Sequence, residues 1–373
     1  PDSEAVISAG ETLTYKQLNE RSNQLAHALI DMGVGANIRV GVCLDRSANL
    51  LVAILGVLKA GGAYVPLDPS YPRERLSYMV KDSAAPVVIT VSEHADCLGS
   101  IDGHVLCLDA EDSGLSGESV VNPKALIDPS QQIYVIYTSG STGQPKGAMV
   151  CHGGEANLQS WYLESLDITN QDRTLMVSAV GFDLSQKNLF APLMVGAGLV
   201  MPSMELYDEH ELLGLINQHA ITWVNCAPSA FYPIVELAAV DGYKALKSLR
   251  FLVLGGEAIR LGPLYPWLTS AHSQAQLINS YGPTECTDVV AFHVLDVIEN
   301  DQQSIPIGKP VPNTQLFILN DNLQQVVPGC IGEICIAGAG VGLGYINRDD
   351  LTEAVFVESS LASGKLYRTG DLG

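Results

Sequence analysis

Short apolar runs alternate with longer amphipathic stretches over most of the chain. The clearest helix signal follows Thr14, since Thr14 and Gln17 have the spacing of a capping box and an apolar face continues to Gly33. That face consists of Leu18, Leu25, Leu29 and Met32. Further strands are expected at 39–44, 63–65, 87–89, 132–136, 175–179, 199–201, 221–226 and 251–254, and helices at 49–59, 73–81, 184–195, 209–219, 230–239 and 263–271. The alternation predicts an α/β fold with mostly parallel sheets covered by helices on both faces.

The pattern changes after about residue 304. Runs such as 315–319 and 333–337 are short and are separated by Gly, Pro and Asn. We therefore expect layered α/β subdomains over residues 1–304 and a smaller β-rich, barrel-like subdomain over residues 305–373.

Charge and composition exclude several classes of protein. The formal net charge of the 373 residues is −21, which argues against a nucleic-acid partner because phosphate contacts need clustered Lys and Arg. No apolar run reaches the ~20 residues of a membrane helix, so we expect no membrane partner. The eight cysteines are dispersed without a C-x-x-C pair, which favours reduced thiols in a cytoplasmic protein.

A glycine-rich loop, YTSGSTGQPKG at 137–147, directly follows the expected strand at 132–136. Glycines allow the backbone to aim successive N–H groups at a phosphate, and Lys146 adds a positive charge. The loop lacks the Ser or Thr that follows Gly-Lys in a Walker A motif, because Gly147 follows Lys146. The sequence therefore predicts a nucleotide-triphosphate loop of another kind.

Several separated strings occur in one order: LKAGGAYVPLDPSY at 58–71, the glycine loop, FDLS at 182–185, NSYGPTE at 279–285, GEICIAGAGVGLGYINR at 332–348 and YRTGD at 367–371. Together they resemble the adenylation domains of nonribosomal peptide synthetases, within the family of acyl-adenylate-forming enzymes. The resemblance covers essentially the whole chain. It implies the large N-terminal core of that family, with two helix-covered sheets in layers.

The resemblance also implies a reaction. ATP activates an amino acid as an aminoacyl adenylate, and the acyl group then passes to the phosphopantetheine thiol of a carrier protein. Mg²⁺ would be held by Glu285, a hard oxygen ligand. The residues implied to be catalytic are Thr284, Lys146 and Thr142. Those implied to bind the nucleotide are Thr138, Ser139, Gly140, Ser141, Gly143, Gly256, Asn279, Tyr281, Gly282 and Asp371.

Asp183 matches the position that holds the substrate α-ammonium in amino-acid-activating members of the family. A buried carboxylate needs such a cationic partner to offset its desolvation. The implied side-chain pocket consists of Leu184, Lys187, Asn225, Val253, Gly255, Ser280, Asp288 and Val289. Gly255 is expected to leave room, and an apolar substrate would leave the polar lining unpaired at about 1–3 kcal/mol for each group. A polar substrate side chain is therefore expected. Lys187 would favour a negatively charged substrate group and Asp288 a positively charged one, unless the two pair with each other. Lys187 also stands where the commoner form of this string has an aromatic residue.

Family members continue beyond the YRTGD string into a small subdomain that carries a further catalytic lysine. No residue here matches that lysine, so residues 1–373 are expected to bind substrates but to adenylate slowly. The implied partners are a carrier-protein domain and neighbouring synthetase domains, with the need for a small MbtH-like protein left open. The alternatives are an acyl- or aryl-CoA ligase, which would not need Asp183, and a non-catalytic nucleotide-binding scaffold.

Overall fold

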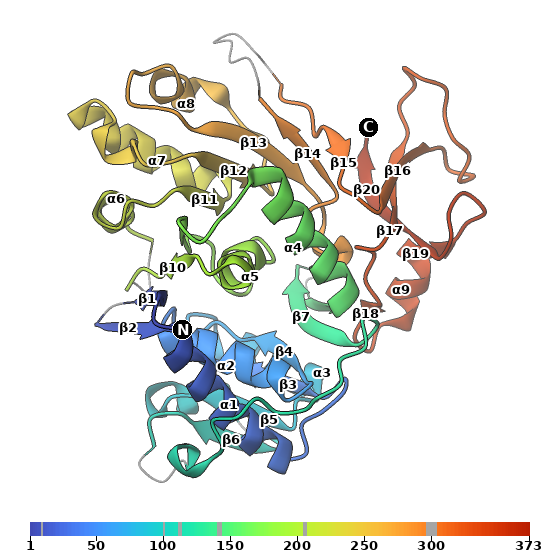
Figure 1. Cartoon of the computed structure of the whole chain (residues 1–373). Coiled ribbons are helices and arrows are strands. Elements are labelled where there is room, and N and C mark those ends of the chain that lie inside the picture. The colour runs from blue at the N-terminus through green and yellow to red at the C-terminus, as the bar shows by residue number, and fades with distance from the viewer. Residues whose placement is uncertain (9, 100, 111–113, 140–143, 204–206, 296–303) are drawn as a thin grey trace.

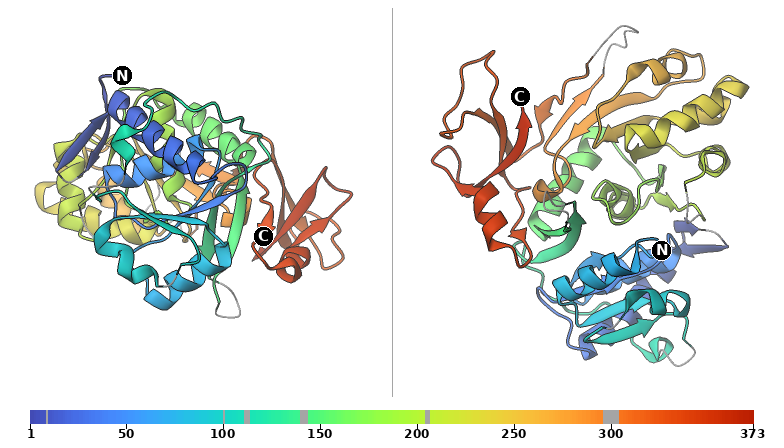
Figure 2. Two further views of the ribbon diagram at one scale, coloured as in Figure 1. Left: turned by 90° about the horizontal axis from the view of Figure 1, so that it is seen from below. Right: turned by 180° about the vertical axis from the view of Figure 1, so that it is seen from behind.

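Three sheets and the helices between and around them make up the fold (Figure 1). The computed structural model describes residues 1–8, 10–99, 101–110, 114–139, 144–203, 207–295 and 304–373. Two large sheets carry most of the chain, and a four-stranded sheet stands to one side of them (Figure 2).

The nine-stranded sheet has parallel strands at its centre and antiparallel pairs at its edges. Its order is β15 (Lys309–Pro310), β14 (Ala291–Val294), β13 (Gln276–Tyr281), β12 (Phe251–Gly255), β11 (Trp223–Cys226), β9 (Arg173–Leu175), β10 (Gly198–Val200), β1 (Glu4–Ser8) and β2 (Glu11–Thr14). The strands from β13 to β1 are the parallel ones.

The seven-stranded sheet has the order β18 (Gly344–Tyr345), β8 (Lys146–Cys151), β7 (Gln132–Thr138), β4 (Ala63–Pro66), β3 (Arg39–Val42), β5 (Val87–Thr90) and β6 (His104–Cys107). The strands from β7 to β6 are parallel, and β8 and β18 pair antiparallel. The prediction of mostly parallel, helix-covered sheets is therefore confirmed.

Buried apolar side chains divide the helices between inner and outer layers. The inner helices are α1 (Tyr15–Asp31), α2 (Ala48–Lys59), α4 (His152–Leu166) and α5 (Ser185–Val195), and they pack between the two large sheets (Figure 1). The outer face of the nine-stranded sheet is covered by α6 (Glu209–Gln218), α7 (Pro228–Ala238) and α8 (Leu261–Leu268). The outer face of the seven-stranded sheet is covered by α3 (Arg73–Ser83). The site is built around α5, which contacts both large sheets.

The small sheet is open. Its antiparallel order is β16 (Thr314–Leu319), β17 (Glu333–Gly338), β20 (Lys365–Leu372) and β19 (Phe356–Glu358), with α9 (Asp349–Val355) beside it. Within the described residues β16 and β19 are the two outer strands and do not pair with each other, so the sheet does not close and the barrel-like expectation is wrong. Two neighbouring strands join other sheets instead: β15 extends the nine-stranded sheet and β18 the seven-stranded one. The division near residue 304 stays a prediction.

Two local expectations differ from the structure. The strand expected at 175–179 is β9 at Arg173–Leu175, because the chain leaves the sheet after Leu175 to form the loop that leads to α5. Met32, expected on the buried face of α1, is 40% exposed because it caps the helix end.

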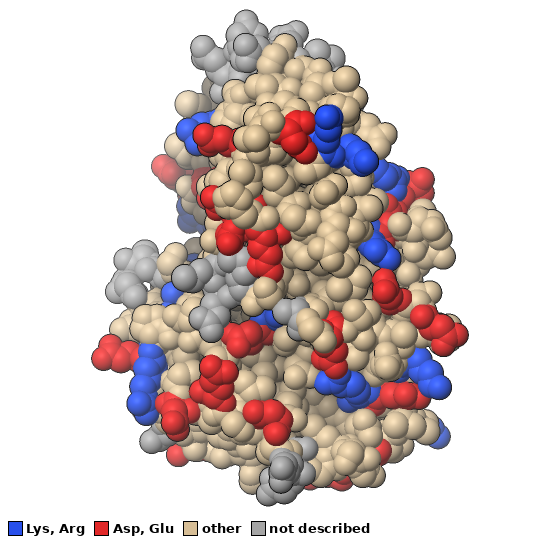
Figure 3. Space-filling view, turned by 90° about the vertical axis from the view of Figure 1, so that its left-hand side faces the viewer, with Lys and Arg blue, Asp and Glu red and all other residues tan. Residues whose placement is uncertain are grey.

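The described surface is in keeping with the chain's acidic composition. On the face shown in Figure 3, Lys and Arg side chains lie scattered among Asp and Glu, so this face has no continuous positive surface. None of the helices in the described part of the chain has the length and apolar character needed to cross a bilayer.

The capping box at the start of α1 gives a direct test of local stability. Thr14 Oγ1 accepts from the Gln17 N–H at 3.2 Å, and Gln17 Oε1 accepts from the Thr14 N–H at 2.9 Å. We expect Thr14→Ala to lower the free energy of unfolding by about 1 kcal/mol in urea denaturation, since an N-cap acceptor is lost. Gln17→Glu keeps the acceptor and is the control. An unchanged free energy in Thr14→Ala would contradict this role.

Candidate active site

The polar residues of the site lie where the central parallel strands of the nine-stranded sheet end. Register pairs Asn225 on β11 with Val253 on β12, and Gly255 on β12 with Ser280 on β13. The carboxyl ends of parallel strands are where ligands bind in open α/β sheets. Residues expected to line one pocket are thus brought together by strand pairing.

A cavity of about 600 Å³ opens beside this edge. Its size is within the range for small-molecule sites. Tyr281 Oη donates to Asp371 Oδ2 at 2.6 Å, and Asn279 Nδ2 donates to the Pro306 carbonyl at 2.9 Å. Five residues expected at the nucleotide site line this cavity: Gly256, Asn279, Tyr281, Gly282 and Asp371. Ser280, which was expected in the side-chain pocket, lines it as well.

A compact triangle of side chains is formed by Lys146, Glu285 and Tyr345. Glu285 lies two residues beyond the 281–283 segment that lines the cavity. Lys146 Nζ lies 3.0 Å from Glu285 Oε1 and donates to Tyr345 Oη at 2.7 Å. Tyr345 Oη in turn donates to Glu285 Oε1 at 2.6 Å. The expected phosphate-binding cation and the expected metal ligand are therefore neighbours.

The donor set fits Mg²⁺. Within the described parts of the chain, no three His, Cys, Asp or Glu side chains gather into a metal cage. Mg²⁺ is commonly held by one or two carboxylates together with the phosphates of its nucleotide, so Glu285 alone is sufficient from the protein's side.

The glycine-rich loop is described only at its ends. Thr138 ends β7, and its buried Oγ1 has no hydrogen-bond partner among the described residues. Ser139 is exposed. Gly140, Ser141, Thr142 and Gly143 lie outside the described residues, so their expected roles stay predictions.

Asp183 lies just before α5, and the Thr284 side chain is close enough to favour its ionised form. Its Oδ1 also accepts from the Leu184 N–H at 3.0 Å. Burial, followed by repulsion from Asp288, raises the pKa of Asp183 to about 7, although Thr284 and Lys187 favour its ionised form. The carboxyl is thus short of positive partners.

A second carboxyl, Glu155 on α4, is buried nearby. Its Oε1 accepts from Gln159 Nε2 at 2.6 Å, and its Oε2 has no partner in the described part of the chain. Burial is the main cause that raises the pKa of Glu155 to about 7. The site therefore concentrates acidic groups in the interior.

The expected side-chain pocket satisfies most of its own polar groups. Lys187 forms a buried ion pair with Asp288, and Ser280 Oγ donates to the Leu254 carbonyl at 3.1 Å. Asn225 Nδ2 donates to the Leu184 carbonyl at 2.5 Å. Among the residues that the structure describes, Asn225 Oδ1 is then the one polar atom of this set without a partner. An apolar substrate would therefore strand one acceptor, not four polar groups.

The space beside Gly255 is filled by neighbouring side chains of the pocket and is not left open for a ligand. A Cβ on Gly255 would lie 2.6 Å from Ser280 Oγ and 3.3 Å from Leu184 Cδ2. Val253 and Val289 are buried in the same region, within the cluster around α4. The pocket is consequently narrow at this end.

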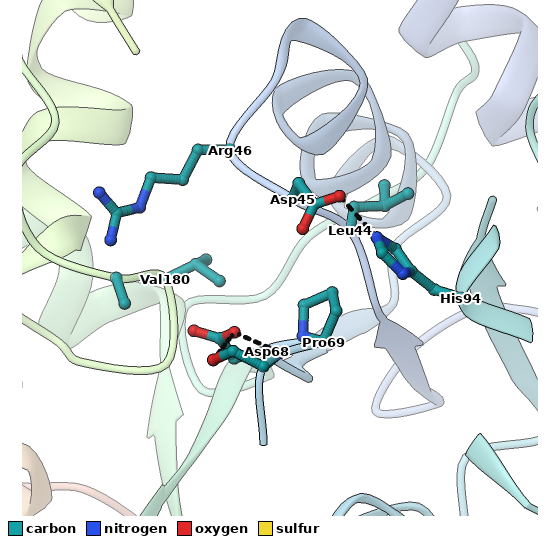
Figure 4. A pocket seen from close by; sticks show the side chains of 9 residues that line it. Leu44, Asp45, Arg46, Asp68, Pro69, His94 and Val180 are labelled. Carbon is teal, nitrogen blue, oxygen red and sulfur yellow. Dashed lines mark hydrogen bonds and ion pairs between the residues drawn. The ribbon is translucent and has the colours of Figure 1, made fainter. Parts of the chain in front are cut away.

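A smaller cavity of about 140 Å³ lies behind the loop that leads to Asp183 (Figure 4). Asp45 and His94 pair across it at 2.5 Å, and Val180 of the loop forms part of its wall. The 58–71 string contributes Asp68 here, and Tyr71 Oη would lie 2.7 Å from a Cβ on Gly181. This string therefore supports the backbone that presents Asp183.

Comparison with known proteins agrees with this geometry. A family model described as AMP-binding enzyme matches residues 1–346. The chain belongs to the AMP-binding enzyme family. The surfactin synthase subunit 2 of Bacillus subtilis (strain 168) is 37% identical over 376 residues, and tyrocidine synthase 1 of Brevibacillus parabrevis is 36% identical over 376. Each match covers 100% of this chain, which spans 10% of the first relative and 33% of the second.

Solved structures of the same family share the fold. The nonribosomal peptide synthetase FmoA3 superposes with a TM-score of 0.93 at 31% identity, over 100% of this chain and 40% of that one. The same synthetase has been solved in an AMPPNP-bound form and in a form with α-methyl-L-serine-AMP. The resemblance to the adenylation domains of these synthetases is therefore confirmed.

Sequence reasoning missed three residues of this candidate site. Tyr345 and the adjacent buried Tyr367 both lie beside Glu285, although the strings that contain them were recognised. Burial and the nearby Glu285 carboxylate raise the pKa of Tyr345, which keeps its proton available for donation. Glu155 was missed because α4 itself was not predicted.

Tyr345→Phe tests the triangle. The variant keeps the ring, which lies 4.3 Å from Lys146 Nζ, but removes the hydroxyl that holds Glu285. A hydrogen bond to a charged group contributes about 1.5–3 kcal/mol, so we expect magnesium-AMPPNP to bind roughly tenfold or more weakly in calorimetric titration. The affinity for AMPPNP measured in the presence of EDTA, without magnesium, should change less.

Tyr15→Phe is the matched control for this test. Its hydroxyl contacts the Pro192 and Ala197 carbonyls, at 2.9 and 2.6 Å, away from the triangle. This variant should lower stability and leave nucleotide affinity unchanged. Equal magnesium-AMPPNP affinity in Tyr345→Phe and the unmodified protein would contradict the positioning role.

Proposed function

We propose that this protein uses ATP to activate an amino acid as its aminoacyl adenylate. The observation that carries the proposal is the contact between Asp183 and Thr284. This proximity supports the proposal, because a carboxylate would pair with an α-ammonium and a neighbouring hydroxyl would suit the reacting carboxylate and α-phosphate. Thr284 adjoins both Pro283, in the wall of the 600 Å³ cavity, and Glu285, in the Lys146 triangle. One segment thus reaches all the groups that the reaction must join.

Each residue has a chemical task in this proposal. Tyr281 and Asn279 hold the base. Asp371 accepts hydrogen bonds from the ribose hydroxyls once the Tyr281 hydroxyl no longer donates to it. Lys146 moves away from Glu285 and neutralises charge on the departing pyrophosphate. Mg²⁺ bound at Glu285 would supply further charge neutralisation on the phosphates. The described site supports this division because the proposed ligands of each part are neighbours.

We propose that the substrate side chain is polar. The support for this proposal is Asn225 Oδ1, a buried acceptor beside Val253 that has no partner among the described side chains and backbone groups. Its amide N–H groups face the Leu184 carbonyl and Asn188 Oδ1, so the oxygen is fixed as the free atom. A hydroxyl or amide donor on the substrate would satisfy it.

The proposed acceptor of the acyl group is the phosphopantetheine thiol of a carrier-protein domain, with neighbouring synthetase domains and an MbtH-like helper as further partners. Support comes from the relatives, of which this chain spans a minor part. A CoA ligase for acids without an amino group would have no use for Asp183 in this position.

Asp183→Ala tests the function directly. We expect it to abolish amino-acid-dependent pyrophosphate exchange, because the α-ammonium loses its counter-ion, while AMPPNP affinity stays within about twofold. The isosteric Asp183→Asn should fail in the same way. Unchanged exchange in either variant would rule out the amino-acid assignment.

The pH dependence of exchange gives an independent test. With an Asp183 pKa of about 7, the carboxyl is mostly neutral at pH 6 and mostly ionised at pH 8. Only the ionised form pairs with an ammonium, so kcat/KM for the amino acid should rise about tenfold between these values. Substrate binding itself would then lower the pKa of Asp183.

Glu155→Gln is the control for this profile, since Glu155 also titrates at about 7. The rise should persist in Glu155→Gln. A flat profile in the unmodified protein, or one that Glu155→Gln removes, would show that Asp183 is not the group responsible.

A further inference from the structure

A groove of about 420 Å³ lies where α1 and α2 meet the segment 122–127 and the start of α4. It shares no lining residue with the cavity proposed for the nucleotide, and its size is within the range of small-molecule sites. Its wall includes Leu58 and Lys59, the first two residues of the 58–71 string, to which the proposed function assigns no role. None of the described residues that line it is acidic, although the chain has a formal net charge of −21.

Lys59, the last residue of α2, is the cation of this groove, and no described carboxylate pairs with it. Its Nζ donates to Asn19 Oδ1 and to Asn23 Oδ1, each at 2.6 Å, and to Asn122 Oδ1 at 3.3 Å. All three acceptors are neutral amides, and burial lowers the pKa of Lys59. A half-buried ammonium without a counter-ion is incompletely compensated for the hydration it has lost.

The rest of the wall is mostly apolar. Leu55 and Leu58 come from α2, and Ala125 and Ile127 from the segment 122–127. Leu126, between the last two, is 94% exposed. Apolar side chains that are exposed beside a groove gain by burial when an apolar ligand covers them.

A second polar group at the groove is incompletely paired. His152, the first residue of α4, lines the groove, and its Nε2 has no partner among the described residues. Burial lowers the pKa of this ring, which favours its neutral form. The groove therefore combines one uncompensated positive charge with apolar walls and no negative charge in its described lining.

We propose that this groove binds a small amphipathic carboxylate, a molecule with one negative group on an apolar body. The carboxylate would take the place of Asn122 Oδ1, whose hydrogen bond to Lys59 is the longest of the three. A charge-assisted hydrogen bond is stronger than the neutral one that it replaces. A neutral apolar molecule would leave Lys59 without its anion, and a small inorganic anion would gain nothing from the leucine walls. This inference does not rest on the proposed function.

Calorimetric titration with octanoate, octanamide and octylammonium tests the assignment. We expect saturable binding of octanoate, and at least tenfold weaker binding of the amide and the amine, because neither brings a negative charge to Lys59. Saturation with magnesium-AMPPNP should leave the affinity for octanoate unchanged, since the groove and the nucleotide cavity share no lining residue.

Two variants remove the two features of the groove separately. Lys59→Met should weaken octanoate binding at least tenfold and leave octanamide binding within about twofold, a difference that general loss of structure would not produce. Ala125→Phe keeps the charge but fills the groove with a ring, so it should weaken octanoate binding at least tenfold as well. Ala125 is exposed, so this variant remains informative if Lys59→Met does not fold. Lys365→Met, at the exposed start of β20, is the matched control and should leave octanoate binding unchanged.

Equal affinities for octanoate and octanamide would overturn the inference, as would the absence of saturable octanoate binding. Octanoate binding that persists in both Lys59→Met and Ala125→Phe would overturn it too. Displacement of octanoate by magnesium-AMPPNP would place the carboxylate in the candidate active site and would also contradict it. None of these outcomes affects amino-acid activation, which pyrophosphate exchange measures separately.

Discussion

Partial burial of Asp183 with too few positive partners is the constraint on which the site depends. Removing a carboxylate from water is costly unless hydrogen bonds and opposite charges replace the lost hydration. Asp183 has Thr284 and the Leu184 N–H, and Lys187 is already committed to Asp288. The unmet demand for positive charge is what an α-ammonium can supply. Neutralisation of Asp183 by the α-ammonium would therefore contribute to the binding free energy of the substrate.

The segment from 279 to 288 distributes this constraint over the rest of the site. Its first residues line the cavity proposed for the nucleotide, Glu285 joins Lys146, and Asp288 joins Lys187. β13 anchors its start within the nine-stranded sheet, while Gly342 and Gly340 hold its end through the Glu285 carbonyl and Thr287 Oγ1. The subsites proposed for nucleotide, metal and amino acid are therefore linked by one segment of ten residues.

Sequence patterns could predict those parts of the fold that local periodicity encodes. Buried parallel strands such as β12 are continuous apolar runs, and α2 is apolar nearly all round, so both were predicted close to their bounds. Helix α4 was not predicted, because buried polar residues such as Glu155 and Gln159 interrupt its apolar positions. The short strand β18 depends on pairing with β8 and has almost no signal of its own.

For the site, the local motifs predicted that Asp183, Thr284 and the cavity residues lie near one another. They could not predict which side chains pair when the partners are far apart in the sequence. Lys187 and Asp288 are 101 residues apart in the sequence, and Lys146 and Tyr345 are 199 apart. Such pairs form only once the sheets and α5 are stacked. The polar lining therefore suggested a polar substrate, whereas the fold shows that most of that polarity is satisfied internally.

The most direct test of the account compares two ligands that differ only at the α position. The protein, saturated with magnesium-AMPPNP, is titrated calorimetrically with its best amino acid and with the α-hydroxy acid that carries the same side chain. The account predicts that the hydroxy acid binds at least tenfold more weakly, a difference of about 1.4 kcal/mol or more, because it cannot neutralise Asp183. Equal affinity for the two ligands would contradict it.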